Sequence, residues 1–206
     1  MLIEVHPENP GKRQISQIVE CLKGGGVIIY PTDTVYGLGC DITNKKAMER
    51  VCRIRNIKPE KANLSFICSD LSHLSDYAKH ISNPIYRLMN SILPGPFTFI
   101  LEGSKLVPKL IRSGKSTVGI RVPDNKIAMA IVEALGNPII STSLHSKDEI
   151  LDYRTDPYNI HEDFGHLVDI VVDGGAGGIE PSTIIDCTSS EPIILREGKG
   201  MELLNF

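Results

Sequence analysis

The chain has 206 residues, of which 41% are hydrophobic and 23% charged, as in an ordinary globular protein of one domain. Its formal net charge of -3 gives no global attraction to nucleic acid or to an anionic membrane, so an RNA or phosphate site requires a local basic patch. No apolar run is long enough to span a bilayer.

The first half of the chain alternates predicted helices and strands. Residues 11–23 carry apolar side chains at spacings of three, four and seven, which predicts a helix that three glycines end. Val27 to Tyr30 form a short buried strand, and Leu38 to Asp41 begin the next one. Asn44 is a suitable cap for a second helix. Further strands are expected at 64–68, 97–102 and 117–121, with a short helix from about residue 70 and another from Ser82-Asn83-Pro84.

The second half continues this alternation. Pro123-Asp124 opens a helix that Gly136 closes, and residues 138–142 form the next strand. Residues 144–163 are polar and weakly patterned, so we expect a loop or a lid there. Some strands are joined by connections too short for a parallel crossover. We therefore predict one α+β domain over residues 1–206, with a twisted mixed sheet flanked by helices. The last strands are expected at 167–172, 183–187 and 192–196, with a glycine-rich turn at 173–178.

The stretch YPTDTVYGLGCD follows the strand that ends at Tyr30. Pro31 cannot extend a central strand, and Gly37 and Gly39 allow a close approach of the backbone to a ligand. The hydroxyls of Thr32 and Thr34 then lie just past a strand end. Two interpretations stay open from these residues: a polar turn that satisfies its own backbone, or one wall of a small-molecule site.

Arginines and hydroxyls recur at the ends of predicted elements. Arginine stays charged and binds carboxylate or phosphate through paired hydrogen bonds, so such a set suits an anion better than general base catalysis. For Arg53 and Arg55 the alternative is that they complement a helix dipole, and His145 is equally compatible with a polar loop. The residues concerned are Arg53, Arg55, Arg121 and Arg196, with Thr32, Thr34, Ser143, Ser182 and Thr183.

Other kinds of site find little support. Gly114-Lys115-Ser116-Thr117 lacks the earlier glycine of a phosphate loop, because Lys109 stands there, and a strand follows it in place of a helix. The five cysteines form no CxxC pair and do not group with the six histidines, which predicts neither a metal site nor a disulfide framework. This dispersion, and a start without signal-peptide character, predict a cytoplasmic protein.

Five separated motifs, in one order from about Lys23 to Gly198, resemble the YrdC/YciO family of threonylcarbamoyl-AMP synthases. The HPENP start and the RIRN segment place the resemblance nearest to the YciO branch. The motifs are YPTDTVYGLGCD, the Arg53-Ile54-Arg55 triplet, Val118 to Pro123 with Ser141-Thr142-Ser143, Ser182 to Asp186, and Ile194 to Gly198.

The resemblance implies a sheet curved around a basic cavity that takes ATP with Mg²⁺, L-threonine and bicarbonate as substrates, with no tightly bound cofactor. It implies formation of threonylcarbamoyl-AMP for tRNA modification, and binding of tRNA or other double-stranded RNA. By position, Arg53, Arg55, Ser143 and His145 are implied as catalytic, Thr32, Thr34 and Arg121 as the threonine side, and Arg55, Ser143, Ser182, Thr183 and Arg196 as the nucleotide side.

Two positions depart from the synthase pattern. Arg53 stands where the synthases carry lysine, and guanidinium differs from ammonium in reach and donor geometry. His145 stands where they carry asparagine, so an imidazole replaces an amide. Asn56 also replaces a proline. These departures keep a second hypothesis open, a non-catalytic protein that binds tRNA, ribosomal RNA or other double-stranded RNA through the same cavity.

Overall fold

The computed structural model describes residues 1–59, 62, 64–72, 74–108, 117–144, 154–189 and 191–204. Its helices are α1 (Lys12–Lys23), α2 (Lys45–Ile54), α3 (Leu74–Tyr77), α4 (Asn83–Ile92), α5 (Lys126–Leu135) and α6 (Pro157–Phe164), with a 3-10 helix η3 (Met201–Leu203). Its strands are β1 (Leu2–Glu4), β2 (Val27–Tyr30), β3 (Gly37–Asp41), β4 (Ser65–Ile67), β5 (Phe97–Glu102), β6 (Thr117–Arg121), β7 (Ile139–Ser143), β8 (Ile170–Asp173), β9 (Thr183–Asp186) and β10 (Ile193–Arg196). Within the described residues, no helix combines the length and the apolar character that crossing a membrane requires.

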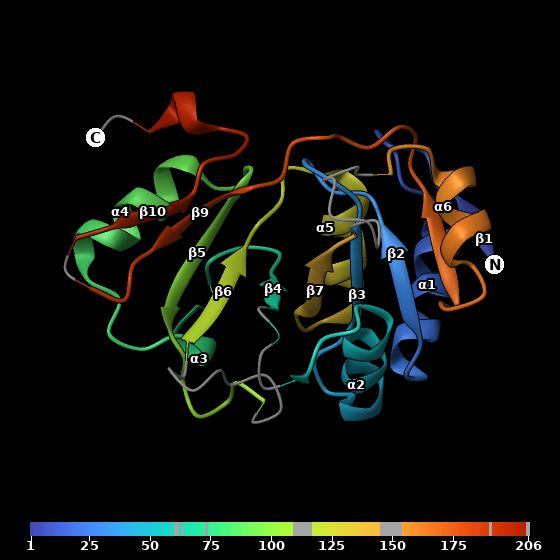
Figure 1. The fold of residues 1–206 in the computed structure, drawn as a ribbon, viewed down its shortest axis with the longest axis horizontal. Helices are drawn as coiled ribbons and strands as arrows, with labels where there is room; N and C mark the ends of the chain where they lie inside the picture. Colours follow the sequence, from blue (N-terminus) through green and yellow to red (C-terminus); the bar gives the residue numbers. More distant parts are fainter. Residues whose placement is uncertain are drawn as a thin grey trace.

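The ten strands form one sheet in the order β1-β8-β2-β3-β7-β4-β6-β5-β9-β10 (Figure 1). Neighbours such as β2 and β3 run antiparallel, whereas β2 and β8 run parallel. The six residues between β2 and β3 are too few for a parallel crossover, which explains the antiparallel pairing. The predicted fold class, a mixed sheet flanked by helices, is confirmed.

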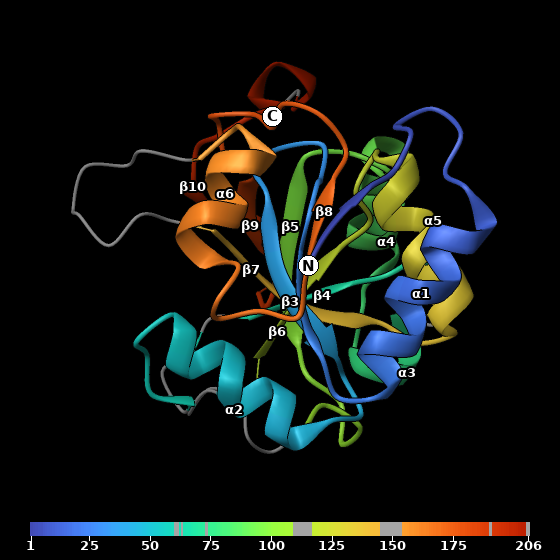
Figure 2. The ribbon, with the colours of Figure 1, turned by 90° about the vertical axis from the view of Figure 1, so that its right-hand side faces the viewer.

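Helices cover both faces of the sheet. Figure 2 shows α1 and α5 on one side of it and α2 and α6 on the other. Ile28 of β2 packs in the cluster that contains α1 and α5, while its neighbours Val27 and Ile29 pack in the cluster that contains α2. Because successive side chains of a strand point to opposite faces, a fully apolar strand such as β2 belongs in a sheet covered on both sides.

Two stretches differ from the sequence-based expectation. β1 was not predicted, because a strand of three residues is too short to show an alternation of apolar and polar side chains. Its pairing with β8 is a long-range contact. Part of the expected loop at 144–163 is helix α6, which Asp156 caps by accepting from Tyr158 N and Asn159 N. Only Pro157 and Ile160 of this helix are buried, so its apolar face was too narrow to recognise. Residues 145–153 of the expected lid lie outside the described part of the chain.

The glycine-rich turn after β8 supports the loop that follows β2. Gly178 N donates to Thr34 O over 2.8 Å, and Tyr36 Oη donates to Gly175 O over 2.7 Å. A Cβ on Gly178 would lie 2.4 Å from Thr34 O, so only glycine lets these two backbones come so close. The turn therefore fixes the position of residues 31–36 from outside.

Gly39 lies in the middle of the sheet, and its replacement tests why β3 contains glycine at this position. A Cβ on Gly39 would lie 2.7 Å from Ile140 O and 2.7 Å from Ile139 Cγ2 of the paired strand β7. We expect Gly39→Ala to lower the free energy of unfolding by about 2 kcal/mol, because a packed sheet cannot move its backbone apart cheaply. Urea unfolding measures this. The control is Gly24→Ala, where the nearest atom to the new Cβ is 3.3 Å away, and an equal loss in both variants would contradict the explanation.

Candidate functional site

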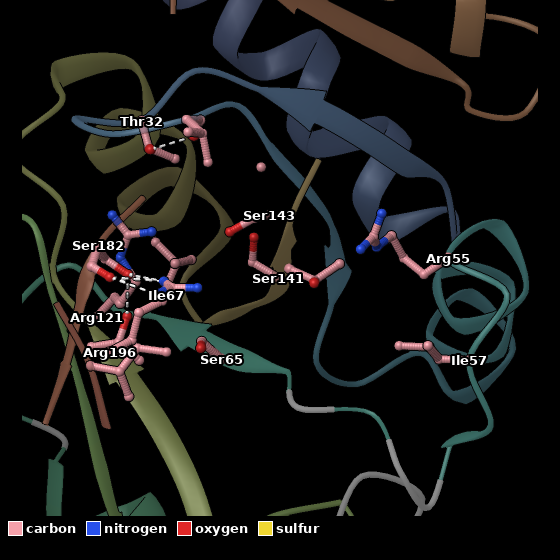
Figure 3. A pocket seen from close by; sticks show the side chains of 15 residues that line it. Thr32, Arg55, Ile57, Ser65, Ile67, Arg121, Ser141, Ser143, Ser182 and Arg196 are labelled. Atoms are coloured by element: carbon pink, nitrogen blue, oxygen red, sulfur yellow. Dashed lines mark hydrogen bonds between the residues drawn. The ribbon is translucent and has the colours of Figure 1, made fainter. Parts of the chain in front are cut away.

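A cavity of about 350 Å³ opens over the middle of the sheet, within the range of small-molecule sites. Figure 3 shows Arg55 and Ile57 on one side of it and Arg121, Ser182 and Arg196 on the other. None of the lining residues that the structure describes carries a carboxylate. The lining consists of guanidinium, hydroxyl and a few apolar groups: Thr32, Val35, Gly37, Arg55, Ile57, Ser65, Ile67, Thr98, Arg121, Ser141, Thr142, Ser143, Ser182, Ile184 and Arg196.

The loop after β2 is a turn whose side-chain hydroxyl makes hydrogen bonds to the loop's own backbone. The same loop forms one wall of this cavity. Thr32 Oγ1 donates to Val35 O over 2.7 Å and accepts from Thr34 N over 3.1 Å, while Thr32 and Val35 line the cavity. The two interpretations that the sequence left open are therefore compatible. Thr34 is 1% exposed and is not among the lining residues; its hydroxyl lies behind the cavity wall.

Arg121 ends β6 and is held by that loop. Its Nη2 donates to Asp33 Oδ1 over 2.8 Å and to Thr34 Oγ1 over 3.1 Å. The side chains of Arg121 and Asp33 are 8% and 6% exposed, so their ion pair is almost fully desolvated. Three strands, β3, β7 and β4, separate β2 from β6 in the sheet. The ion pair thus joins two segments that the cavity floor keeps apart.

Arg196 of β10 reaches the end of β9. Its Nε and Nη2 donate to Ser182 O over 3.1 and 2.8 Å, and Nη2 also donates to Ser182 Oγ over 3.2 Å. Ser182 Oγ in turn lies 2.9 Å from Thr98 Oγ1. Thr183 is fully buried and does not line the cavity; its hydroxyl donates to Lys199 O and accepts from Gly198 N. Thr183 therefore holds the segment after β10.

Strand β7 forms the floor of the cavity with Ser141, Thr142 and Ser143. Tyr30 Oη donates to Ser141 Oγ over 2.7 Å from inside the sheet. Burial raises the pKa of Tyr30 to about 12, so its phenol stays a proton donor at any physiological pH. A Cβ on Gly37 would lie 3.0 Å from Ser141 Oγ, and its absence leaves that hydroxyl open to the cavity.

The two arginines at the C-terminal end of α2, Arg53 in its last turn and Arg55 at its C-cap, have different surroundings. Arg55 is the C-cap residue of the helix and lines the cavity, whereas Arg53 is exposed and is not among the lining residues. Positions two apart on a helix point about 200° apart, so a spacing of two cannot bring both side chains to one site. His145 lies outside the described residues, so its implied catalytic role stays a prediction.

Sequence reasoning missed part of the lining. Ser141 and Thr142 belong to a motif that the sequence singled out but were given no role, whereas Ser65 of β4 and Thr98 of β5 lay outside every motif and also line the cavity. Their signal was weak, because a single hydroxyl within an apolar strand is common in sheets. The described residues contain no group of three or more His, Cys, Asp or Glu side chains that could hold a metal ion.

Comparisons with known proteins show the family of this chain. A family model described as "Telomere recombination", which covers the Sua5, YciO and YrdC proteins, matches residues 20–198. The chain belongs to the Sua5/YciO/YrdC family. This confirms the family that the five motifs indicated.

Three relatives show the range of similarity. An uncharacterized protein of Haemophilus influenzae is 48% identical over 95% of this chain and 94% of its own length. YciO of Escherichia coli, also described as uncharacterized, is 46% identical over the same shares. A threonylcarbamoyl-AMP synthase of Halorhodospira halophila is 30% identical over 85% of this chain and 92% of its own.

Two solved structures share the fold. The crystal structure of E. coli YciO superimposes with a TM-score of 0.90 at 44% identity, covering 97% of this chain and 96% of that one. The structure of Pyrococcus abyssi Sua5 complexed with L-threonine has a TM-score of 0.84 at 28% identity. It matches 96% of this chain but only 57% of the archaeal protein.

The burial of the Tyr30 phenol, which outweighs the opposite effect of its hydrogen bond to Ser141, gives a prediction about pH. The folded pKa of about 12 lies above the ordinary value near 10, so the stability that Tyr30 contributes is complete below pH 10 and falls as pH rises toward 12. We expect Tyr30→Phe to cost about 1 kcal/mol at pH 8, because Ser141 loses its donor. Between pH 8 and pH 11 the variant should then lose on the order of 1 kcal/mol less stability than the wild type.

Urea unfolding at both pH values, with a thiol reductant present, measures these differences. The control is Tyr158→Phe, which removes the hydroxyl of a tyrosine that is 62% exposed. Parallel pH curves for the wild type and Tyr30→Phe would contradict the assignment.

Proposed function

We propose that this protein is a threonylcarbamoyl-AMP synthase that uses L-threonine, bicarbonate and ATP with Mg²⁺. The observation that carries the proposal is the convergence of Arg55, Arg121 and Arg196, from three segments, on one cavity that is lined with hydroxyls and has no carboxylate among its described lining residues. Such a lining favours anions, and both threonine and ATP present anionic groups. The family membership supports the choice of substrates.

Threonine is expected at the end of the cavity near the loop after β2. Arg121 offers a guanidinium whose position Asp33 and Thr34 fix, which suits the carboxylate of an amino acid. Thr32 lies on the same wall and can contact the polar groups of threonine. The solved complex of P. abyssi Sua5 with L-threonine makes this amino acid the first choice among ligands.

The nucleotide is expected along β7, β9 and β10. Ser143, Ser182 and Arg196 come from these strands or their ends, and Arg55 faces them across the cavity. Thr183 supports the nucleotide site without lining it, because its hydroxyl makes hydrogen bonds to the backbone of the segment that follows Arg196. In this arrangement the phosphates of ATP lie between Arg55 and Arg196.

The chemistry that we assign to the site is positioning and charge neutralisation. The amine of threonine first condenses with bicarbonate and releases water to give a carbamate, whose oxygen then attacks the α-phosphate of ATP and displaces pyrophosphate. Arg55 and Arg196 stabilise the negative charge that develops on the phosphates, and the hydroxyls orient the reacting groups. Mg²⁺ enters with ATP as part of the substrate. No covalent nucleophile is required.

An assay with purified protein tests this function. Labelled L-threonine, bicarbonate and Mg-ATP should yield threonylcarbamoyl-AMP and pyrophosphate, and Arg196→Ala should lower the rate about 100-fold, because one positioned donor to the phosphates is lost. The matched control is Arg87→Ala, which removes an exposed arginine of α4. No product above a reaction without protein, or equal rates for Arg196→Ala and the wild type, would contradict the proposal.

RNA binding is a second candidate function, and the placement of Arg53 favours it. Arg53 is exposed in the last turn of α2 and points away from the side chain of Arg55, so it can meet a phosphate backbone outside the rim of the cavity while the cavity holds a nucleotide. Binding of this kind weakens with salt, because each phosphate contact releases counterions.

We expect a tRNA transcript to bind more weakly as salt rises, and Arg53→Ala to reduce the slope of log affinity against log salt by about one. Filter binding or fluorescence anisotropy over a salt series measures this, with Arg87→Ala as the control of equal charge change. Affinity that is independent of salt, or an Arg53→Ala slope equal to that of the wild type, would count against RNA binding at Arg53.

A further inference from the structure

Asp33 is the one carboxylate that the structure places directly against an arginine of the cavity wall in the described part of the chain. Its Oδ1 accepts from Arg121 Nη2 over 2.8 Å, and both side chains are more than nine-tenths buried. Asp33 itself does not line the cavity, whereas Arg121 does. The carboxylate therefore stands behind the guanidinium, on the side away from any ligand.

The bonds made by Arg121 decide which of its N–H groups are available. Nη2 carries two hydrogens, and Asp33 Oδ1 and Thr34 Oγ1 accept both of them. An anion in the cavity must therefore be met by the remaining N–H groups of the guanidinium. Asp33 and Thr34 thus determine which edge of Arg121 faces the ligand.

The ion pair between Asp33 and Arg121 does not have the hydrogen bonding that would make its contribution to folding stability greatest. Asp33 Oδ2 and Arg121 Nε are both buried and have no hydrogen-bond partner among the described residues. A buried ion pair offsets its desolvation cost only when further hydrogen bonds satisfy its remaining polar atoms, so these two unsatisfied atoms reduce what the pair contributes to stability. A single bond between the two side chains holds the orientation of the guanidinium without occupying all its donors.

Asp33 is in turn held in place by a hydrogen bond to its backbone carbonyl oxygen. Lys199 Nζ donates to Asp33 O over 2.6 Å, and Thr183 Oγ1 holds Lys199 through its carbonyl oxygen over 3.0 Å. The carboxylate therefore sits on a loop that is tied to the segment after β10. This gives it the rigidity that a side chain needs to orient another one.

We propose that Asp33 is a positioning residue, which orients Arg121 so that its free edge binds the carboxylate of the amino-acid substrate. The proposal rests on the proposed function, because it names how the threonine end of that site is prepared. Asp33 makes no contact with the substrate itself. Its effect on binding passes entirely through Arg121.

A double-mutant cycle on L-threonine binding tests this. Calorimetry gives the affinity of the wild type, Asp33→Asn, Arg121→Met and the double variant, without ATP. We expect Asp33→Asn to weaken threonine binding about tenfold in the wild-type background and to change it less than twofold when Arg121 is already methionine. L-Threoninamide, which lacks the carboxylate, should bind to the wild type and to Asp33→Asn with similar affinity.

Two further variants complete the experiment. Glu8→Gln removes an exposed carboxylate that pairs with Lys126 and should leave threonine binding unchanged. If Asp33→Asn does not fold, Asp33→Glu takes its place in the same cycle, because it keeps the charge and moves the carboxylate by one methylene group. The expected coupling to Arg121 is then the same.

The outcomes separate the two proposals. A wild type that binds no threonine overturns the proposed function and this inference with it. A wild type that binds threonine, with an aspartate variant that binds equally well, overturns the inference alone. Equal losses in both backgrounds, or equal losses for threonine and threoninamide, also overturn it, because Asp33 would then act independently of Arg121 or of the substrate carboxylate.

Discussion

The ion pair between Asp33 and Arg121 is the interaction on which the site depends. It joins the loop after β2 to the end of β6, across the three strands that form the cavity floor. Because both side chains are buried, loss of either partner would leave the other charge buried and unpaired, so the pair holds Arg121 against the loop. The glycine-rich turn after β8 and Lys199 hold the same loop from outside. These contacts support the end of the cavity where we place threonine from both sides.

The rest of the site uses the sheet as a frame for hydroxyls and arginines. Ser141 is oriented by Tyr30, Ser182 by Arg196 and Thr98, and each of these bonds links a strand to a different segment of the chain. Such a lining can bind anions without a metal-binding cluster of side chains and without a nucleophile. This fits a reaction in which the protein mainly brings an amino-acid carbamate and a nucleotide phosphate together.

Much of the fold was predictable because its signals are local. The spacing of apolar residues in α1, the caps at Asn44 and Ser82, and the glycine that ends α5 all act within one or two turns of the chain. The mixed parallel and antiparallel character of the sheet could be predicted because some connections between consecutive strands are too short for a parallel crossover. β1 and α6 were not predicted, since β1 exists only through its partner strand and α6 buries only two of its residues.

The sequence by itself determined the family and the residue types of the site, because the motifs carry arginine and hydroxyl groups in the order that is typical of the family. Tertiary structure alone decided which of these groups reach the cavity. It placed Arg55 at the cavity and Arg53 at the surface, moved Thr34 and Thr183 behind the wall, and added Ser65 and Thr98 to the lining. The physical reason is that strand order brings together residues far apart in the chain, and no local pattern records which of them will become neighbours.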